Sequence, residues 1–527
     1  MNVRRYQKWA KSGLAIMLAG AMMVGTAASG GGMTAQAAET ESSDTVSTQK
    51  AVTSDAASLL FTEKHITSDL TLPTIGASGT TISWKSSNPS VLSNEGKVTR
   101  PKKGAADEEV TLKGTVKMGD YAKARKFAFV VLAESEMGPT KEFALDQVEL
   151  LDDYYLTAQN SDIEFLKKFD NDRLLSRFRE TAGLDTKKIA PYGGWEDGWL
   201  GGHSVGHYLT AIAQAVKATG NADLKEKSKQ LIKGLAECQN KLGTGFIFGA
   251  KIETEGYVEK QFDILEGKTT GKTWVPWYNM HKMLTGLVDT YKYTGNKQSL
   301  EVAKKLGDWI YNRVSKWDAG TQGRVLGTEY GGMNDCLYEL YLCTRDSKHL
   351  EAAHKFDEPN LYKTVAKGGK NCLNGKHANT TIPKFLGALK RYVVLEQTGE
   401  LTKDDEAYLT NVEKFFDIAV TRHAYITGGV SVMEHFRKDN NQDGTRTQTN
   451  CESCCAHNML KMAKELYKVT GDKKYADYYE TTLRNSIMGA VKSESGAAAY
   501  FIPMATGYFK TFGNEDPAKN MFWCCTG

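Results

Sequence analysis

A short phrase that ends one helix and begins the next recurs along the chain and constrains its fold more than any other feature. It reads Thr-Gly-Asn from Thr219 and Thr294, Thr-Gly-Glu from Thr398 and Thr-Gly-Asp from Thr470, with a weaker Thr-Arg-Asp from Thr344. Glycine readily takes the left-handed position that closes a helix, and apolar residues with helical spacing flank each phrase. Each phrase therefore predicts a helical hairpin.

The spacing of these phrases predicts a toroid of hairpins. Their threonines are 75, 50, 54 and 72 residues apart, and an opening helix is expected over residues 145–178. About six hairpins in series predict a mainly α fold, an (α/α)6 barrel over residues 139–527. The uneven spacing predicts insertions, over residues 246–277 and 425–450, that line one mouth of the barrel.

The amino-terminal residues account for the whole net charge. The formal net charge is +4, and the first 37 residues contain four basic and no acidic residues. With these four subtracted from the 67 Lys and Arg residues, the rest of the chain has 63 basic and 63 acidic residues. This balance argues against nucleic acid as a partner.

Residues 1–37 have the parts of a secretory signal peptide. A basic stretch ends at Lys11, an apolar run covers residues 14–27, and Ala35-Gln36-Ala37 is a small-x-small cleavage pattern. The apolar run is too short to span a bilayer. We therefore expect a secreted or cell-surface protein with no membrane span after cleavage, although an uncleaved amino-terminal anchor is the alternative. No obligate protein partner is indicated.

The segment after the signal peptide predicts a linker and then a small β domain. Residues 38–58 are rich in Ser, Thr and Ala without a hydrophobic period, as in a linker. Residues 59–135 contain short alternating runs, at 81–84, 97–99, 110–112 and 126–131, that are typical of a β-sandwich. The stretch around Trp84 resembles the atrophied immunoglobulin-like modules of secreted bacterial enzymes. Trp84 itself fits either the core of this domain or a surface on which sugars stack.

Five of the nine cysteines fall into two groups that suit a metal ion. They are Cys451, Cys454, Cys455, Cys524 and Cys525. Together with Glu452 they offer the sulfur and oxygen ligands that Zn²⁺ takes in tetrahedral geometry. Two ligand sets are open, one of Cys451, Cys454 and the Cys-Cys pair, the other with Glu452 in place of Cys451. A disulfide such as Cys454 to Cys524 is a third interpretation, because we expect the protein to be exported.

Polar residues at the starts of several helices form a second set of candidates. They are His203, His281, Asn334, His377 and Glu434. Each precedes the apolar face of a helix or, for Glu434, follows a Gly-Gly turn, so all are expected at one end of the barrel. A single histidine in such a place is more often a capping or core residue. Several at equivalent hairpin positions favour a polar pocket, whereas the alternative for Glu434 is an exposed loop acid.

Eight motifs, in order, resemble the β-L-arabinofuranosidases of glycoside hydrolase family 127 and its near relative, family 146. They are Gly-Trp-Glu, Gly-His-x-x-Gly-His-Tyr-Leu, Tyr-Asn-Met-His-Lys, Glu-Tyr-Gly-Gly-Met-Asn, Gly-Lys-His-Ala-Asn-Thr, Thr-Gly-Gly, Glu-Ser-Cys and Cys-Cys-Thr-Gly. The resemblance covers residues 143–527. Each motif alone is unspecific, and their shared order and spacing carry the resemblance.

The resemblance implies a metal ion and a nucleophile. Zn²⁺ would be held by Glu452, Cys454, Cys524 and Cys525, and Cys524 would attack the sugar. Glu434 would be the general acid/base of a retaining glycosidase that releases L-arabinofuranose from β-linked plant glycans or glycoproteins.

The resemblance also implies a sugar pocket and a further domain. His281 and His377, with His203 and Asn334, would bind substrate, whereas Cys451 and its neighbour Cys455 have no matching role and are expected to pack. A β-sandwich that follows the Cys-Cys pair in the family is absent, since the chain ends at residue 527. We therefore expect this chain to be truncated at its carboxyl end.

Two other functions compete with the glycosidase. An (α/α)6 polysaccharide lyase or epimerase would use His and Tyr for proton transfer and leave the cysteines structural. A non-catalytic carbohydrate-binding protein would use zinc, held by four cysteines, only to stabilise its fold.

Overall fold

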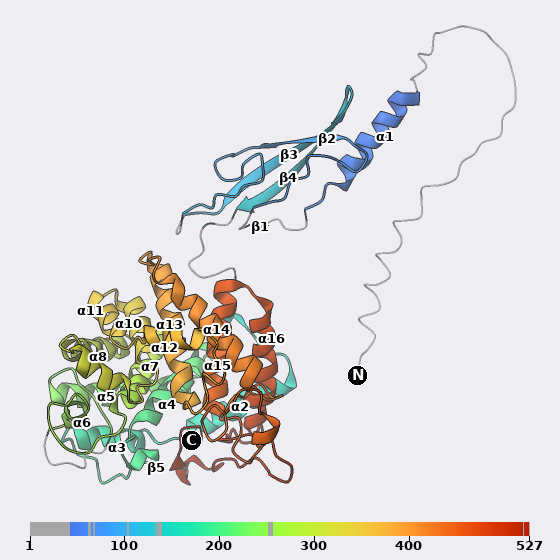
Figure 1. The fold of residues 1–527 in the computed structure, drawn as a ribbon. Helices are drawn as coiled ribbons and strands as arrows, with labels where there is room; N and C mark the ends of the chain where they lie inside the picture. Colours follow the sequence, from blue (N-terminus) through green and yellow to red (C-terminus); the bar gives the residue numbers. More distant parts are fainter. Residues whose placement is uncertain are drawn as a thin grey trace, which may run out of the picture. The chain divides into compact units, whose positions relative to one another are not determined.

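The computed structural model describes residues 43–61, 65–66, 69–102, 105–131, 133, 140–250, 257–519 and 521–525. The chain forms two compact units, Met1–Arg100 with Asp107–Val131, and Pro101–Ala106 with Leu132–Gly527 (Figure 1). The expected signal peptide over residues 1–37 lies outside the described residues.

The described strands of the first unit form one four-stranded sheet in the order β1-β4-β3-β2. Their bounds are His65–Ile66 for β1, Thr81–Ser86 for β2, Glu108–Met118 for β3 and Tyr121–Val131 for β4. β1 runs parallel to β4 and the other pairs are antiparallel. Trp84 packs against Phe61 and Phe127 and donates its indole N–H to the carbonyl oxygen of Pro73 at 2.9 Å. Trp84 is therefore a core residue of this unit.

The expectation of a linker over residues 38–58 is wrong for its described part, because Ser43–Ser58 form helix α1. Val52 and Ala56, one helical turn apart, are buried together with Ile82 and Val116 of the sheet. Asp55 accepts a hydrogen bond of 2.7 Å from the hydroxyl of Thr80. Sequence reasoning missed the helix because only a few small apolar residues mark its buried face.

The described residues of the second unit form a barrel of six helical hairpins. Five inner helices pack side by side in chain order: α4 (His203–Thr219), α7 (Pro276–Thr294), α10 (Met333–Thr344), α13 (Ala378–Thr398) and α15 (Ser453–Thr470). Each packs against one helix of an outer layer: α5 (Ala222–Leu242), α8 (Lys297–Val314), α11 (Ser347–His354), α14 (Glu406–His423) and α16 (Lys473–Thr482). The first hairpin, α2 (Asp153–Lys167) and α3 (Asn171–Thr181), packs against α4 and α5.

The ring closes where the chain after α16 returns to α2. Arg484 donates a hydrogen bond of 3.3 Å to the hydroxyl of Tyr155. Short helices connect the hairpins: α6 (Lys260–Leu265), α9 (Ala319–Leu326) and α12 (Pro359–Ala366). Of the two insertions that we expected, residues 246–277 lie mainly between α5 and α7 and contain α6, and residues 425–450 lie between α14 and α15.

The recurring phrase works in the structure as predicted. Gly220 and its counterparts in the other three glycine phrases have φ between 69° and 75° and close their helices, and Arg345 takes the same left-handed position with φ 54°. The threonine of each phrase donates its hydroxyl to a carbonyl one turn back, as Thr219 does to Ala215 at 2.7 Å. The following Asn or Asp caps the next helix, as Asn221 does for Leu224 at 3.0 Å.

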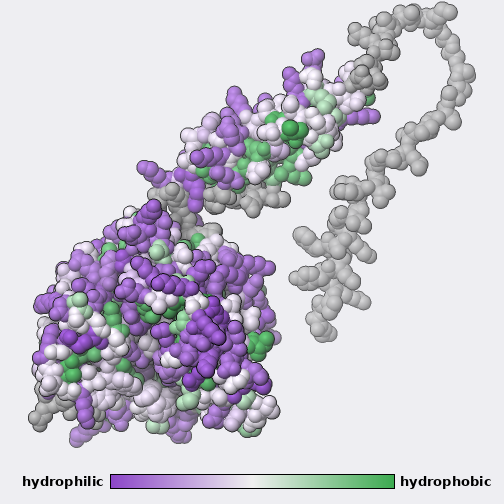
Figure 2. Space-filling view, in the orientation of Figure 1, coloured by the Kyte–Doolittle hydropathy of each residue, from purple (hydrophilic) through white to green (hydrophobic). Residues whose placement is uncertain are grey.

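The surface of the second unit is mostly polar on the face shown in Figure 2, with hydrophobic residues scattered over it. None of the helices in the described part of the chain combines the length and the apolar composition that a membrane span requires.

Candidate metal centre and active site

Two short strands hold the Cys-Cys pair in place. β5 (Gly193–Gly194) pairs in parallel with β6 (Met521–Phe522), two residues before Cys524. The buried ring of Phe522 stacks on Phe169 with 5.3 Å between the ring centroids. Gly194 has φ 73°, and a Cβ there would lie 2.3 Å from the carbonyl oxygen of Phe522. The backbone contact thus requires glycine at this position.

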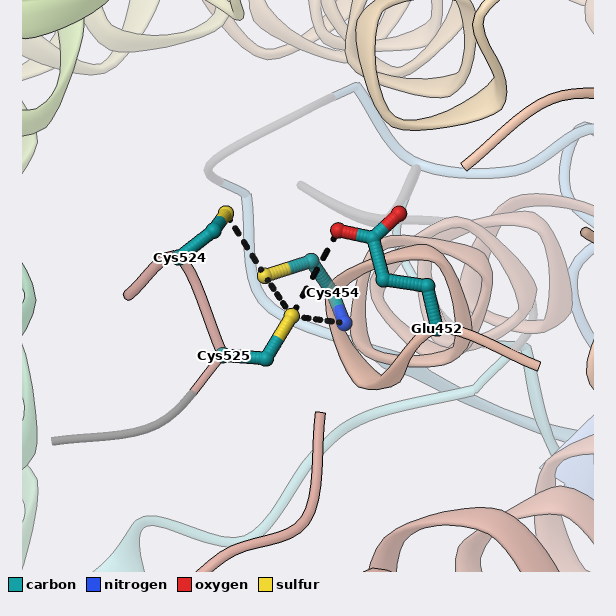
Figure 3. A group of neighbouring side chains, drawn as sticks. All are labelled: Glu452, Cys454, Cys524 and Cys525. Carbon is teal, nitrogen blue, oxygen red and sulfur yellow. Dashed lines mark hydrogen bonds between the residues drawn. The ribbon is translucent and has the colours of Figure 1, made fainter. Parts of the chain in front are cut away.

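The first turn of α15 supplies the other half of the cluster. Glu452 stands at the N-cap and Cys454 in the first turn. The Sγ atom of Cys454 lies 3.1 Å from that of Cys524 and 2.7 Å from that of Cys525. The Sγ atom of Cys525 is 3.4 Å from Oε1 of Glu452. Figure 3 shows the three sulfur atoms and the carboxylate turned toward one another, and all four ligand atoms lie within 4.8 Å.

The composition of this cluster fits a metal ion. All nine cysteines are free, so the disulfide interpretation is not supported. Glu452 is completely buried, and burial raises the pKa of its carboxyl group well above the usual value. A carboxylate among three thiols is costly to bury unless a cation compensates it. The cluster therefore has both the donors and the electrostatic need for a metal ion.

The two remaining cysteines of the group differ in their surroundings. Cys451 packs with Ala490 and Ala499, away from the other sulfur atoms, so the ligand set that includes Cys451 is not the one that the structure assembles. Cys455, expected only to pack, donates its thiol to Oε2 of Glu452 at 3.1 Å. Cys455 thus fixes the carboxylate from the side opposite to Cys525.

Two residues that the sequence reasoning did not single out contact Cys524. The hydroxyl of Tyr278 lies 3.3 Å from its Sγ atom. The side-chain amide of Asn379 donates to the same sulfur at 3.4 Å and to Oε1 of Glu452 at 3.1 Å. Hydrogen bonds from Cys454 and Cys525 lower the pKa of the Cys524 thiol well below its usual value. Of the three thiols, Cys524 is the one that most readily becomes a thiolate.

The anchor at Phe522 yields a testable prediction. Phe522→Ala removes the stacked ring that holds the strand before Cys524, and we expect the bound metal per chain to fall by at least half while the far-ultraviolet circular dichroism of the barrel persists. Met521→Ala, an exposed neighbour on the same strand, is the control. Equal metal content in both variants would contradict this role of β6.

Glu434 lies on a loop whose backbone is left-handed at two successive residues and is fixed by a hydrogen bond to the start of α13. Met433 and Glu434 have φ of 44° and 63°, and the carbonyl oxygen of Glu434 accepts a hydrogen bond from the amide of Ala378 at 2.6 Å. Its Oε2 atom is 3.2 Å from Nε2 of His377, and its Oε1 atom accepts from the hydroxyl of Tyr500. The hydrogen bond from His377 lowers the pKa of Glu434 below its usual range. Tyr500 lies outside every motif and was missed.

The contact between His377 and Glu434 predicts a shift in pH dependence. His377→Asn keeps a side chain suited to the N-cap of α13 but removes the ring that lowers the pKa of Glu434. The pKa of Glu434 then rises, its protonated form persists to higher pH, and the alkaline limb of kcat/KM moves upward. His435→Ala, which removes a half-buried imidazole that packs against the ring of His377, should leave that limb in place. A pH–rate profile without a shift in His377→Asn would contradict the assignment.

His203 and His281 are buried histidines on adjacent inner helices. His203 begins α4 and lies 3.2 Å from Glu196, which in turn accepts the amide N–H groups of Gly202 and Ser204. The Nδ1 atom of His281 accepts the amide N–H of Gly332 at 2.9 Å, and burial lowers the pKa of His281 well below its usual value. His281 is therefore neutral and carries its proton on Nε2.

The structure does not bring Asn334 to the cluster. Its side-chain amide donates to Asp357 at 3.0 Å and to the hydroxyl of Tyr362 at 3.4 Å, and its carbonyl oxygen accepts from the backbone of Asp335. As the motif predicts, Asn334 lies in the first turn of an inner helix, α10. Its side chain, however, belongs to a buried hydrogen-bond network with Asp357 and Tyr362. The contact between Asn334 and a sugar stays a prediction, and Asn379 is the asparagine at the cluster.

Two family profiles match this chain. The profile of the β-L-arabinofuranosidase GH127 catalytic domain matches residues 147–527. The chain belongs to glycoside hydrolase family 127. The profile of an atrophied bacterial Ig domain matches residues 44–134, a span that includes nearly all of α1. Among curated proteins, no sequence matches the chain.

A solved structure of this family shares the fold. A GH127 β-arabinofuranosidase has 19% identity and a TM-score of 0.54, over 73% of this chain and 60% of its own. A GH127 β-L-arabinofuranosidase from Geobacillus stearothermophilus T6 has 16% identity and a TM-score of 0.46, over 68% of this chain and 56% of its own. The chain thus spans less than two thirds of the length of these two structures. The family match favours a glycoside hydrolase over the lyase, epimerase and binding-protein alternatives.

Proposed function

We propose that this protein is an exported, zinc-dependent retaining β-L-arabinofuranosidase with Cys524 as nucleophile and Glu434 as general acid/base. The observation that carries the proposal is the convergence of Glu452, Cys454, Cys524 and Cys525 within 4.8 Å in a chain of family 127. The substrate is a plant-type glycan or glycoprotein that bears β-linked L-arabinofuranose. The amino-terminal sequence supports export.

The metal ligands are Glu452, Cys454, Cys524 and Cys525. When bound there, Zn²⁺ would keep a coordinating thiol deprotonated at neutral pH and compensate the buried carboxylate. Before a metal ion binds, hydrogen bonds from the thiols of Cys454 and Cys525 already lower the pKa of Cys524. Asn379 orients the sulfur and the Glu452 carboxylate together through its two hydrogen bonds.

The chemical steps need one nucleophile and one proton carrier. The sulfur of Cys524 attacks the anomeric carbon and forms a C–S bond as the C–O bond to the leaving group breaks, and Glu434 gives that oxygen its proton. Glu434 then takes a proton from water, which displaces the sulfur and regenerates the thiolate. The charge of Cys524 acts on the pKa of Glu434, which supports their pairing in one site. Two displacements at the same carbon retain its configuration.

Metal analysis of the purified protein tests the cofactor. We expect about one zinc per chain, and loss of zinc in Cys454→Ser, because a thiolate ligand is removed. Cys238→Ser, a buried cysteine outside the cluster, is the control and should keep its zinc. Another metal in stoichiometric amount, or unchanged zinc in Cys454→Ser, would contradict the proposed centre.

A further inference from the structure

Three tryptophans gather beside the proposed nucleophile and have no part in the chemistry above. The ring of Trp195 lies 5.7 Å from that of Trp274 and 5.3 Å from that of Trp523, measured between centroids. Trp274 is 44% exposed and Trp523 is 40% exposed, whereas Trp277 in the following helix is completely buried. The trio therefore presents indole surface to solvent.

The chain places this trio at the reacting sulfur. Trp523 directly precedes Cys524, and Trp274 lies just before α7, four residues ahead of Tyr278, whose hydroxyl is 3.3 Å from the Cys524 sulfur. Trp195 packs against the buried cluster that contains Tyr278. The exposed rings thus border the site instead of lying on a distant surface.

We infer that Trp195, Trp274 and Trp523 form a stacking platform for an uncharged sugar ring next to the arabinofuranose that is released. This inference rests on the proposed function. Indole rings offer a large, flat apolar surface with a single polar N–H, and the C–H face of a sugar ring is complementary to such a surface. The substrate that fits is a glycan of at least two sugars, in preference to arabinofuranose attached directly to a small group.

The test compares two substrates that differ only in the leaving group. The ratio of kcat/KM for an oligosaccharide with a terminal β-L-arabinofuranosyl residue to that for methyl β-L-arabinofuranoside is measured in the wild type and in Trp274→Ala. We expect the ratio to fall about tenfold in the variant, because a stacked ring is lost only with the oligosaccharide. Phe509→Ala, an exposed aromatic residue elsewhere, should keep the wild-type ratio.

The outcomes separate this inference from the proposed function. An unchanged ratio in Trp274→Ala, with wild-type turnover of both substrates, would overturn the platform and leave the proposed function intact. Turnover of neither substrate by the zinc-loaded wild type would overturn the proposed function and the platform with it.

A second feature, on the first unit, is independent of the active site. Lys85, Lys113 and Lys126 stand directly opposite one another across β2, β3 and β4, and Lys117 follows on the same face of β3. All four side chains are exposed. Like charges directly opposite on neighbouring strands destabilise a sheet, so the row is a cost to the folded domain.

Nothing in the described part of this unit offsets that cost. Over residues 43–61, 65–66, 69–102 and 105–131, the four ammonium groups have no ion pair or hydrogen bond. Glu109 is the one acidic residue on this face of β2 to β4, and the residues between the lysines are Ser, Thr and Ala. Protection of a sheet edge explains Lys85 and Lys126, because β1 pairs with β4 only at Val130 and Val131, but it does not explain Lys113 and Lys117 on the interior strand β3.

We propose that this lysine row binds an acidic polysaccharide that carries a carboxylate on successive sugars. Neighbouring strands are about 4.8 Å apart. Lys85, Lys113 and Lys126 therefore place one positive charge on each of three successive strands, above a surface of small side chains. The lysine face has no arginine, the residue best suited to bidentate binding of phosphate. Trp84, Phe127 and Phe129 of the same strands lie in the core, on the opposite face of the sheet. Carboxylates in series match this pattern better than phosphates or neutral sugars.

Binding of the full chain to polygalacturonate tests the proposal. We expect affinity that falls as salt is raised and that drops more than tenfold in the triple variant K85Q/K113Q/K126Q. The control is K50Q/K97Q/K123Q, which removes the same charge from exposed lysines outside the row and should change affinity less than twofold. The row variant should unfold at or above the wild-type temperature, since like charges are removed.

Three results would overturn this proposal. They are an equal loss of affinity in both triple variants, equal binding of the fully methyl-esterified polymer, and tighter binding of inorganic polyphosphate than of polygalacturonate.

Discussion

Cys524→Ser is expected to reduce kcat/KM on 4-nitrophenyl β-L-arabinofuranoside on the order of 10⁴-fold, as loss of a covalent nucleophile does in other hydrolases. The hydroxyl of serine stays protonated at neutral pH, whereas the pKa of the Cys524 thiol lies well below its usual value. The volume change is small, and the strand before Cys524 remains anchored by Phe522. Thermal unfolding should therefore stay close to that of the wild type.

The control for this prediction is Cys372→Ser, a free cysteine of the barrel outside the cluster. It should keep wild-type activity and zinc content. Activity of Cys524→Ser within tenfold of the wild type, measured at equal zinc occupancy, would remove Cys524 from the role of nucleophile.

Glu434→Gln is expected to lower kcat by about 10² to 10⁴-fold, the usual contribution of a general acid/base. Glutamine keeps the shape of the side chain and the contacts with His377 and Tyr500 but carries no proton to give. The loss should be larger for an alkyl leaving group than for 4-nitrophenolate, which departs without a proton. The measurement is kcat of Glu434→Gln and of the wild type, each on an alkyl and on a 4-nitrophenyl β-L-arabinofuranoside.

Hydrolysis of the sugar–Cys524 intermediate, in which Glu434 takes a proton from water, predicts a further observation on Glu434→Gln. With 4-nitrophenyl substrate, attack by Cys524 proceeds faster than release, so a pentosyl group accumulates on the protein and is detected as a mass increase on the peptide that contains Cys524. Asp443→Asn, an exposed acid in the same insertion, is the control. Equal losses on both substrates without any labelled peptide would contradict the role of Glu434.

The barrel could be predicted from the sequence because its signals are local. Thr219, Gly220 and Asn221 each act within one helical turn, as a hydroxyl donor, a left-handed C-cap and an N-cap. The metal cluster could be predicted only as a set of residue types. Spacing left open whether Cys451 or Glu452 completes it, and the resemblance to family 127 favoured Glu452, with which the structure agrees.

The parts that sequence reasoning missed depend on contacts between distant segments. Tyr500 reaches Glu434 across 66 residues, and Asn379 reaches Cys524 across 145 residues. Asn334 stood in a motif of the same kind as Asn379, but its side chain is turned into a buried network by Asp357. Helix α1 was missed because its stability comes from the sheet beneath it and not from its own sequence.

The configuration of the first product formed in the presence of methanol tests the central claim most directly. Methanol traps the sugar as a methyl glycoside that does not change its configuration afterwards, and proton NMR of that product reads the anomeric centre. With 4-nitrophenyl β-L-arabinofuranoside and zinc-loaded protein, the account predicts methyl β-L-arabinofuranoside, since displacement by Cys524 and then by methanol retains configuration. The α-configured product, or no turnover at full zinc occupancy, would contradict it.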